Sequence, residues 1–255
     1  MPEGYEKKRG RSDEISSCMK NIFHKFFRFF LKFLKWFFIV SIVSVILFRW
    51  IPVPYTPFMF VQCAEQVFDT KREVKLKKDW VPLEEISPNL QLAVICSEDQ
   101  NFFQHHGFDF DAIEKAVEHN RKHKRTHGAS TISQQTAKNV FLYDGRNWIR
   151  KGLEVYFTFT LELFWSKKRI IEAYLNVIEF GNGIYGAEAA AQQFFNTSAK
   201  KLTRTQAALL AAVLPAPRKF SVKNPSPYVR KRQAWILGQM ENWGGPLEFE
   251  TDAKK

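Results

Sequence analysis

Apolar residues are concentrated in one stretch near the N-terminus. Residues 36–48 contain no charged side chain, and their only polar side chains are two serines. This run is shorter than the roughly 20 residues that cross a bilayer. The Phe-rich segment before it adds length, because the long side chains of Arg28, Lys32 and Lys35 can extend to the lipid headgroups. The pattern predicts one transmembrane helix over residues 28–50.

Two other interpretations of this stretch are weaker. A cleaved signal peptide ends in small residues, whereas RWIPVPYTP follows here. A buried core helix would not carry so many flanking cations. Nine Lys or Arg residues lie between Lys7 and Lys35. The positive-inside rule therefore predicts a cytoplasmic tail over residues 1–27 and export of everything after Arg49.

Beyond the anchor, apolar positions mostly follow a helical period. Capping residues mark three helix starts, at Ser87 before a proline, at Asp109, and at Thr131 with Gln134 three positions later. Further helices are expected over residues 148–165, 167–178, 187–195 and 205–213. Strand signals are weak, so the predicted fold class is all-α. The expected organisation is a proline-containing juxtamembrane linker, a helical domain and a C-terminal tail, over residues 51–79, 80–245 and 246–255.

The length and net charge of the chain limit its possible binding partners but do not identify one. The chain has 255 residues, enough for an anchor and one catalytic domain, and a net charge of +12. Such a charge attracts nucleic acid, an anionic membrane surface or a phosphorylated substrate. Cys18 is expected on the opposite side of the membrane from the other two cysteines. Cys63 and Cys96 could form a disulfide or remain free thiols.

A pair of carboxylates stands in the segment SEDQNFFQHHGFD, residues 97–109. Glu98 and Asp99 lie at the end of a predicted helix, and Phe102 and Phe103 follow. Aromatic neighbours would shield a carboxylate from water and make it a better proton acceptor. The alternative is an ordinary solvent-exposed Glu-Asp pair.

Two later segments favour phosphate binding. Around the helix start in residues 127–142, backbone amides with Ser130, Thr131 and Lys138 could cradle phosphate oxygens. An ordinary capped helix is the alternative. In residues 145–157, cations suited to a diphosphate accompany one carboxylate: Arg146, Arg150, Lys151 and Glu154. Ion pairs on a helix surface would explain the same spacing.

Taken in order, these segments resemble the family 51 peptidoglycan glycosyltransferases in their monofunctional, membrane-anchored form. The likeness covers about residues 80–225. Its first three motifs are represented by Glu98, Asp99, Phe102, His105 and Gly107, by residues 128–139, and by Arg150, Lys151 and Glu154. The last two are residues 167–195, with Glu172, Tyr174, Asn176, Gly181 and Gly186, and residues 209–225. Small departures from the family pattern are Ala129, Ser133 and Leu153.

The resemblance implies a lysozyme-like helical fold and lipid II as substrate. Glu98 would be the general base that deprotonates the C4 hydroxyl of the acceptor sugar, in an inverting transfer that releases undecaprenyl diphosphate. Glu154 would be the second catalytic carboxylate and would help to hold the diphosphate. The substrate-binding residues implied are Asp99, Phe103, Ser130, Thr131, Gln134, Gln135, Lys138, Asn139, Arg146, Arg150, Lys151 and Asn176.

No cofactor is implied as a requirement, and no metal-ligating residue is assigned. A divalent cation, Mg²⁺ or Mn²⁺, could neutralise the diphosphate. The expected partners are lipid II, the growing glycan chain, membrane lipid and proteins of cell-wall synthesis or cell division, but not nucleic acid. The expected location is the bacterial inner membrane, with a single pass and a periplasmic catalytic domain. Family members are inhibited by moenomycin, which mimics the donor.

Two motifs are decoys, and two rival functions stay open. His119, His123 and His127 recur at helical spacing but lie among cations, which favours a basic surface over a zinc site. Residues 198–201 match the S-x-x-K of penicillin-binding transpeptidases, but no K-T-G follows. A lytic enzyme on the same fold is the first rival. A non-enzymatic basic scaffold or nucleic-acid binder is the second.

Overall fold

The computed structural model describes residues 3–69, 74–123, 128–145, 147–245, 247 and 249, and the chain divides into two compact units. The first, Met1–Leu47, is the single helix α1 (Glu3–Leu47). Its segment Phe23–Leu47 is 25 residues long and apolar enough to cross a membrane. The prediction of one N-terminal membrane-spanning helix is therefore confirmed by length and composition. The helix ends at Leu47, before the predicted end at residue 50.

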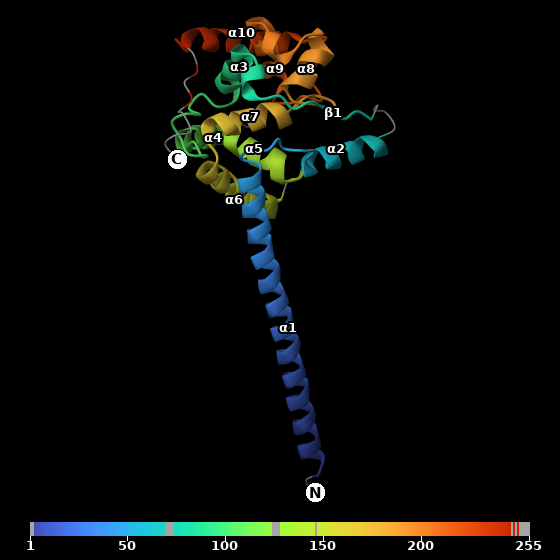
Figure 1. The fold of residues 1–255 in the computed structure, drawn as a ribbon. Helices are drawn as coiled ribbons and strands as arrows, with labels where there is room; N and C mark the ends of the chain where they lie inside the picture. The colour runs from blue at the N-terminus through green and yellow to red at the C-terminus, as the bar shows by residue number, and fades with distance from the viewer. Residues whose placement is uncertain are drawn as a thin grey trace. The chain divides into compact units, whose positions relative to one another are not determined.

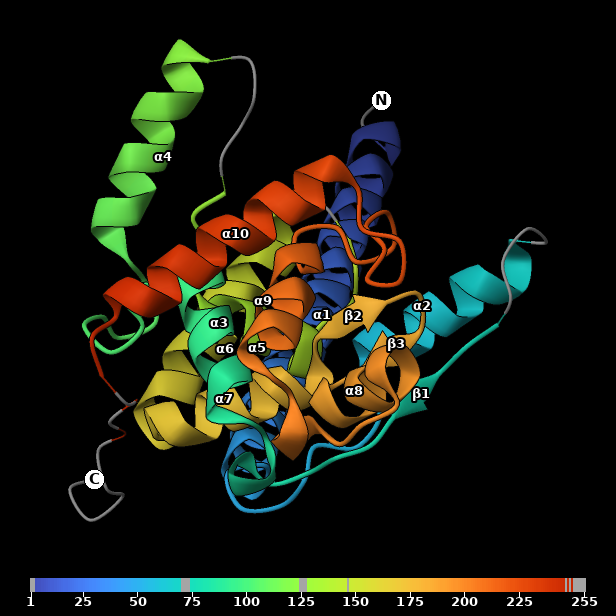
Figure 2. The ribbon, with the colours of Figure 1, turned by 90° about the horizontal axis from the view of Figure 1, so that it is seen from above.

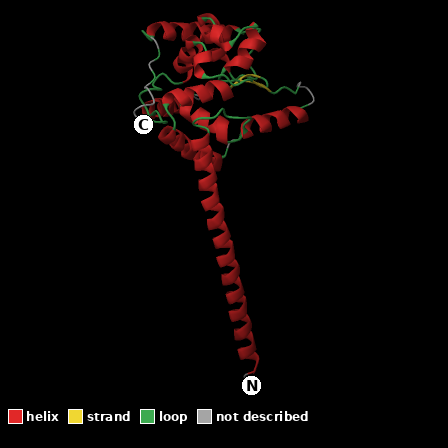
Figure 3. Ribbon diagram, in the orientation of Figure 1, coloured by secondary structure: helices red, strands yellow, loops and turns green. Residues whose placement is uncertain are grey.

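The second unit, Phe48–Lys255, is mostly helical, which confirms the all-α prediction (Figure 3). Its α-helices within the described residues are α2 (Pro57–Phe68), α3 (Pro88–Glu98), α4 (Phe110–Lys122), α5 (Ile132–Phe141), α6 (Trp148–Phe164), α7 (Lys167–Val177), α8 (Ala187–Phe195), α9 (Arg204–Val213) and α10 (Pro227–Asn242). Two short 3-10 helices are η1 (Leu83–Glu85) and η2 (Ala199–Lys201).

Capping side chains start these helices where the sequence predicts. Ser87 accepts a hydrogen bond from the amide of Asn89, and Asp109 caps α4. Thr131 and Gln134 form the complete capping box at the start of α5. These bonds satisfy amide groups that have no partner within their own helix.

Two helices were not predicted, although each has a capping residue followed by proline. Thr56 caps α2, which lies within the predicted linker and packs against α5. Ser226 caps α10 near the end of the domain. In both cases the proline occupies the first turn, where its missing N–H costs no hydrogen bond.

One small sheet ties the chain after α2 to the body of the unit. Its strands are β1 (Lys77–Lys78), β2 (Glu179–Gly181) and β3 (Ile184–Tyr185), in the order β1-β3-β2. β1 runs parallel to β3, and β2 runs antiparallel to it. Gly183 turns between β2 and β3 with φ +68°, and a Cβ there would lie 2.0 Å from the carbonyl oxygen of Lys75. Only glycine fits that position.

Two groups of helices form the core of this unit. α9 packs against α3 and α10, and α5 packs against α6 and α7 (Figures 1 and 2). The centre of α7 is fully buried at Tyr174. The last turn of α3 carries Glu98 from the first group towards α5 of the second. The candidate chemistry therefore lies where the two groups meet.

The cysteine and histidine alternatives can be followed within the described residues. Cys63 and Cys96 are free thiols, so the disulfide alternative is wrong. Burial raises the pKa of the Cys96 thiol to about 11, which keeps it protonated. The ring of His119 on α4 stacks on the ring of His123, which follows the helix, with the centroids 4.1 Å apart. His127 lies outside the described residues.

Candidate active site

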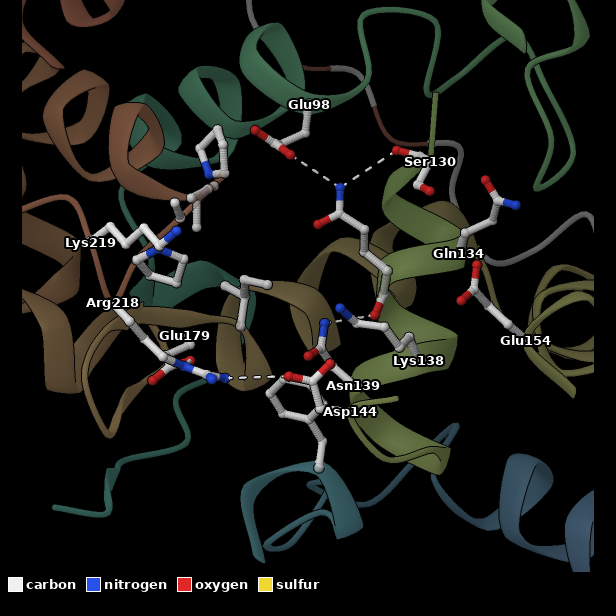
Figure 4. Close-up of a pocket in the computed structure, with 17 residues that line it drawn as sticks. Glu98, Ser130, Gln134, Lys138, Asn139, Asp144, Glu154, Glu179, Arg218 and Lys219 are labelled. Atoms are coloured by element: carbon white, nitrogen blue, oxygen red, sulfur yellow. Dashed lines mark hydrogen bonds and ion pairs between the residues drawn. The ribbon is translucent and has the colours of Figure 1, made fainter. Parts of the chain in front are cut away.

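A cleft of about 430 Å³ opens between the two helix groups (Figure 4). Its polar lining comes from α3, α5 and α6, the turn after α5, β2 and the segment that follows α9. The lining residues are Phe58, Glu98, Ser130, Gln134, Gln135, Lys138, Asn139, Asp144, Glu154, Ile178, Glu179, Leu214, Pro215, Ala216, Pro217, Arg218 and Lys219. Glu98, Lys138 and Glu154 therefore share one cavity.

Glu98 is the last residue of α3, and its side chain is 13% exposed. Its Oε1 accepts a hydrogen bond from the hydroxyl of Ser97 at 3.0 Å and lies 3.4 Å from a guanidinium nitrogen of Arg232. Its Oε2 accepts a hydrogen bond from the side-chain amide of Gln135 at 3.1 Å. The carboxylate is thus fixed on both oxygens while it lines the cleft.

Neither of the two phenylalanines expected to shield Glu98 lines the cleft. Phe102 is fully buried in the core, where Lys167 lies over its ring. Phe103 packs against Phe102 and is not part of the cleft lining. The described polar contacts of Glu98 come from the Ser97 hydroxyl, the Gln135 amide and the Arg232 guanidinium.

Lys138 stands one turn after Gln134 and Gln135 on α5, so the three side chains share a helix face. Its ammonium lies 5.2 Å from the centre of the Phe58 ring. Burial lowers the pKa of Lys138, while the nearby carboxylates of Asp144 and Glu154 oppose the shift. The cleft therefore holds a partly buried cation beside two acids.

Glu154 brings its carboxylate to the cleft from α6, with a side chain only 5% exposed. Arg150 donates to its Oε2 at 2.7 Å, and Lys151 donates to its Oε1. The bonds follow the (i, i+4) and (i, i+3) spacing of a helix. Arg146, the fourth predicted member of this group, lies outside the described residues.

A second charged cluster in the cleft was not predicted. Arg218 donates to Glu179 on β2 at 2.9 Å and lies 3.7 Å from Asp144 and 3.9 Å from Glu65. Gln62 on α2 donates to the same Asp144 carboxylate at 2.9 Å. These contacts fasten α2 to the wall of the cleft. They join residues that are far apart in the chain, so no local sequence pattern could predict them.

The chain belongs to a known family of enzymes. The family model described as Transglycosylase matches residues 65–241, well over half of the chain. The chain is a member of the transglycosylase family. Its relatives include biosynthetic peptidoglycan transglycosylases of Bdellovibrio bacteriovorus, 56% identical over 80% of this chain and 81% of the relative, and of Haemophilus influenzae, 54% identical over 82% and 85%. A third, from Mannheimia succiniciproducens, is 53% identical over 80% and 84%.

The transglycosylase match is longer than the segment recognised by motif. It begins within α2, inside the predicted linker, and ends within α10. Arg232, which contacts Glu98, is included. With its apolar helix α1, this transglycosylase is a membrane-anchored protein.

Two predicted substrate-binding residues of the transglycosylase brace the start of α5. Asp99 is buried, and its Oδ2 accepts from the amide of Ile132 at 2.9 Å, while His105 lies 2.9 Å from Oδ1. Thr131 is buried and donates its hydroxyl to the carbonyl of Gly107 at 2.6 Å. These side chains occupy the helix start that was predicted to cradle phosphate, so that prediction is not supported by the geometry.

Asn176 also lies away from the cleft. It is fully buried on α7, and its side chain exchanges hydrogen bonds with both backbone groups of Val81, each 2.9 Å long. It joins the segment before η1 to α7. Ser130, Gln134, Gln135, Lys138 and Asn139 are the predicted substrate-binding residues that line the cleft.

Among the described residues, no three His, Cys, Asp or Glu side chains are grouped so that they could hold a metal ion by themselves. Both oxygens of Glu154 are already engaged by Arg150 and Lys151. The described charged side chains that line the cleft are four acids and three cations: Glu98, Asp144, Glu154 and Glu179, and Lys138, Arg218 and Lys219.

Proposed function

We propose that this transglycosylase polymerises lipid II into β-1,4-linked glycan strands. The observation that carries the proposal is the placement of Glu98, Lys138 and Glu154 around one cavity. A proton acceptor and a cationic diphosphate cradle are the two things that glycosyl transfer from a lipid diphosphate needs. The printed names of the relatives, biosynthetic peptidoglycan transglycosylases, agree with it.

In the proposed step, Glu98 removes the proton from the C4 hydroxyl of the acceptor N-acetylglucosamine. The freed oxygen attacks the anomeric carbon of the donor N-acetylmuramic acid as the bond to the diphosphate breaks. The electron pair leaves with undecaprenyl diphosphate, and the α-linked donor becomes a β-linked product. Among the described residues, the Oε2 atom of Glu98 accepts one hydrogen bond, from the neutral amide of Gln135, so it is the oxygen proposed to take the proton.

The leaving group gains negative charge as the bond breaks. Lys138 is the cation that lines the cleft from α5, and Glu154 holds Arg150 and Lys151 beside it. Cations fixed in advance at the position of developing charge lower the barrier without having to reorganise. A diphosphate stabilised in this way needs no strong general acid, unlike the leaving group of a glycosidase.

The proposed location follows from the substrate. Lipid II is embedded in the membrane, so an enzyme anchored by α1 diffuses in the same membrane plane as its substrate. The cations before the span favour a cytoplasmic N-terminus and a periplasmic catalytic unit in the inner membrane. Proteins of cell-wall synthesis or cell division are the proposed protein partners.

The test is incubation of the purified full-length protein with lipid II in detergent. Glycan polymer with released undecaprenyl diphosphate is the expected result, and moenomycin and the Glu98→Gln substitution should each abolish it. Degradation of isolated cell walls without polymerisation would instead establish the lytic alternative. A non-enzymatic role would be indicated if the protein showed neither activity and if Glu98→Gln left its binding to nucleic acid unchanged.

A further inference from the structure

Arg232 approaches the Glu98 carboxylate from behind the cleft. It lies in the second turn of α10, a helix that packs against α3 and α9, and it is not among the residues that line the cavity. One of its terminal nitrogens donates to the hydroxyl of Ser97 at 3.0 Å and lies 3.4 Å from Oε1 of Glu98. A single guanidinium thus contacts both Glu98 and the residue before it.

These contacts form a directed chain. Because the guanidinium only donates, the Ser97 oxygen must accept from it. The Ser97 hydroxyl proton then has the Glu98 carboxylate as its nearer acceptor, at 3.0 Å, and the carbonyl oxygen of Ala211 as a longer one, at 3.5 Å. Ser97 donates to Oε1 at 3.0 Å, the same oxygen that faces Arg232. One carboxylate oxygen is therefore committed to the protein, and the other is left with the neutral amide of Gln135.

The Arg232 side chain leaves one buried nitrogen without a hydrogen bond among the described residues, which a residue needed only for packing would not do. The Arg232 side chain is 24% exposed, and its Nε is buried without a hydrogen-bond partner among the described residues. A brace between helices could be built from apolar side chains without leaving a polar atom unsatisfied. A charged contact at this place favours one rotamer of the neighbouring carboxylate.

The other groups around Glu98 do not supply that charge. Tyr174 on α7 reaches it only through Gln135, and burial, with the nearby carboxylates of Glu98 and Asp99, raises the pKa of Tyr174 and keeps it neutral. Asp99 is itself an acid and is engaged with Ile132 and His105. Among the described contacts of the Glu98 carboxylate, Arg232 is the cation.

We infer that Arg232, acting through Ser97, is the positioning residue for the catalytic base. It fixes Oε1 so that Oε2 faces the acceptor hydroxyl. This inference rests on the proposed function, because it assigns Glu98 the role of base. It also extends the functional unit to α10, a helix outside the five recognised motifs.

The test compares kcat and KM for lipid II polymerisation in the full-length protein. Arg232→Met should lower kcat by about 10- to 100-fold, since small displacements of a reacting group have effects of that size. KM and moenomycin binding should stay close to wild type, because Arg232 does not line the cleft. Arg232→Lys should recover most of the loss. Lys231→Gln, an exposed charge change on the same helix, is the matched control.

Each outcome bears on a different claim. Polymerisation by wild type but undiminished kcat in the folded Arg232→Met protein would overturn the inference and leave the proposed function standing. A protein that binds moenomycin but never polymerises lipid II would overturn the proposed function itself. If Arg232→Met lowers the unfolding temperature too far to assay, Ser97→Ala interrupts the same chain. Its kcat should then fall while KM holds, and an unchanged kcat would contradict the inference.

Discussion

The two glutamates of the cleft, Glu98 and Glu154, differ in the groups that hold them. Glu154 has a full cation on each oxygen, at hydrogen-bonding distance from Arg150 and Lys151. Glu98 has a hydroxyl and a more distant guanidinium on one oxygen and a neutral amide on the other. The sequence analysis treated both as catalytic carboxylates.

The difference separates their roles. Both Glu154 oxygens accept charge-assisted hydrogen bonds from cations, so this carboxylate is less suited than that of Glu98 to accept a proton. In the proposed mechanism, Glu154 fixes Arg150 and Lys151 for contact with the diphosphate. Glu98 keeps one oxygen available at the cleft surface, as a general base requires. This difference supports the proposal that Glu98 is the base and that Glu154 positions cations.

The largest expected effect is that of Glu98→Gln. The amide keeps the shape of the carboxylate but cannot accept the proton, so kcat for lipid II polymerisation should fall by about 1,000-fold or more, within the usual range for loss of a general base. The unfolding temperature should remain close to that of wild type. Polymerisation at a tenth of the normal rate would show that another group is the base.

Glu154→Gln should have a smaller effect on rate and a larger one on stability. Removing one partner of a buried ion pair leaves the other uncompensated, so the free energy of unfolding should fall by about 3 kcal/mol. The displaced cations should reduce kcat by about 10- to 100-fold. Steady-state polymerisation and chemical denaturation measure the two quantities.

A matched control exists away from the cleft. Glu172 on α7 pairs with Arg169 three positions earlier, with both side chains largely buried, and it does not line the cavity. Glu172→Gln should therefore lose stability much as Glu154→Gln does but retain far more activity. If the two variants lose activity equally, Glu154 acts only through folding, and its proposed role with the diphosphate is contradicted.

Lys138→Met should raise the KM for lipid II by about tenfold, the equivalent of roughly 1.4 kcal/mol of lost binding. The alkaline pH dependence sharpens this test. Burial lowers the pKa of Lys138 below the ordinary lysine value of 10.5, so the ammonium loses its proton at a lower pH than an exposed lysine would. In wild type, KM should rise as pH increases through that lowered pKa. Lys138→Arg keeps its charge and should not show the rise.

Deprotonation of Lys138 does not destabilise the fold, so unfolding caused by this residue cannot explain the rise in KM with pH. Between the lowered pKa and 10.5 the unfolded chain binds more protons at this residue than the folded protein does. Its contribution to the free energy of unfolding therefore increases with pH in that window. An alkaline rise in KM that persists in Lys138→Arg would assign the titration to a different group.

Local signals predicted the helices well and the site only in part. The caps at Ser87, Asp109 and Thr131 were predicted because a cap is decided by neighbours within four residues. The ion pairs of Glu154 follow from helical spacing alone. By the same logic, Thr56 and Ser226, each followed by proline, could have revealed α2 and α10.

The remaining features depend on distant parts of the chain. Asp99 was assigned to the substrate, yet it satisfies an amide 33 positions later. Arg232 meets a carboxylate 134 positions earlier, and Arg218 meets Glu179 across 39 positions. Such pairings are set by how helices pack, which no local window reports. These long-range contacts determine which polar residues line the cleft and which ones join the elements around it.

The smallest predicted effect concerns the neutral hydrogen bond that the Gln135 amide donates to Glu98. The Tyr174 hydroxyl donates to Oε1 of Gln135 at 3.1 Å, which turns the NH₂ group of the same amide towards Glu98. In Tyr174→Phe that constraint is lost, and the amide can rotate to place an oxygen against the carboxylate. One neutral hydrogen bond contributes about 1 kcal/mol, so kcat should fall by about fivefold, with KM unchanged. Gln135→Glu, which places a carboxylate against Glu98 outright, should cost more than Tyr174→Phe. The reverse order would mean that the Gln135 amide does not orient the base.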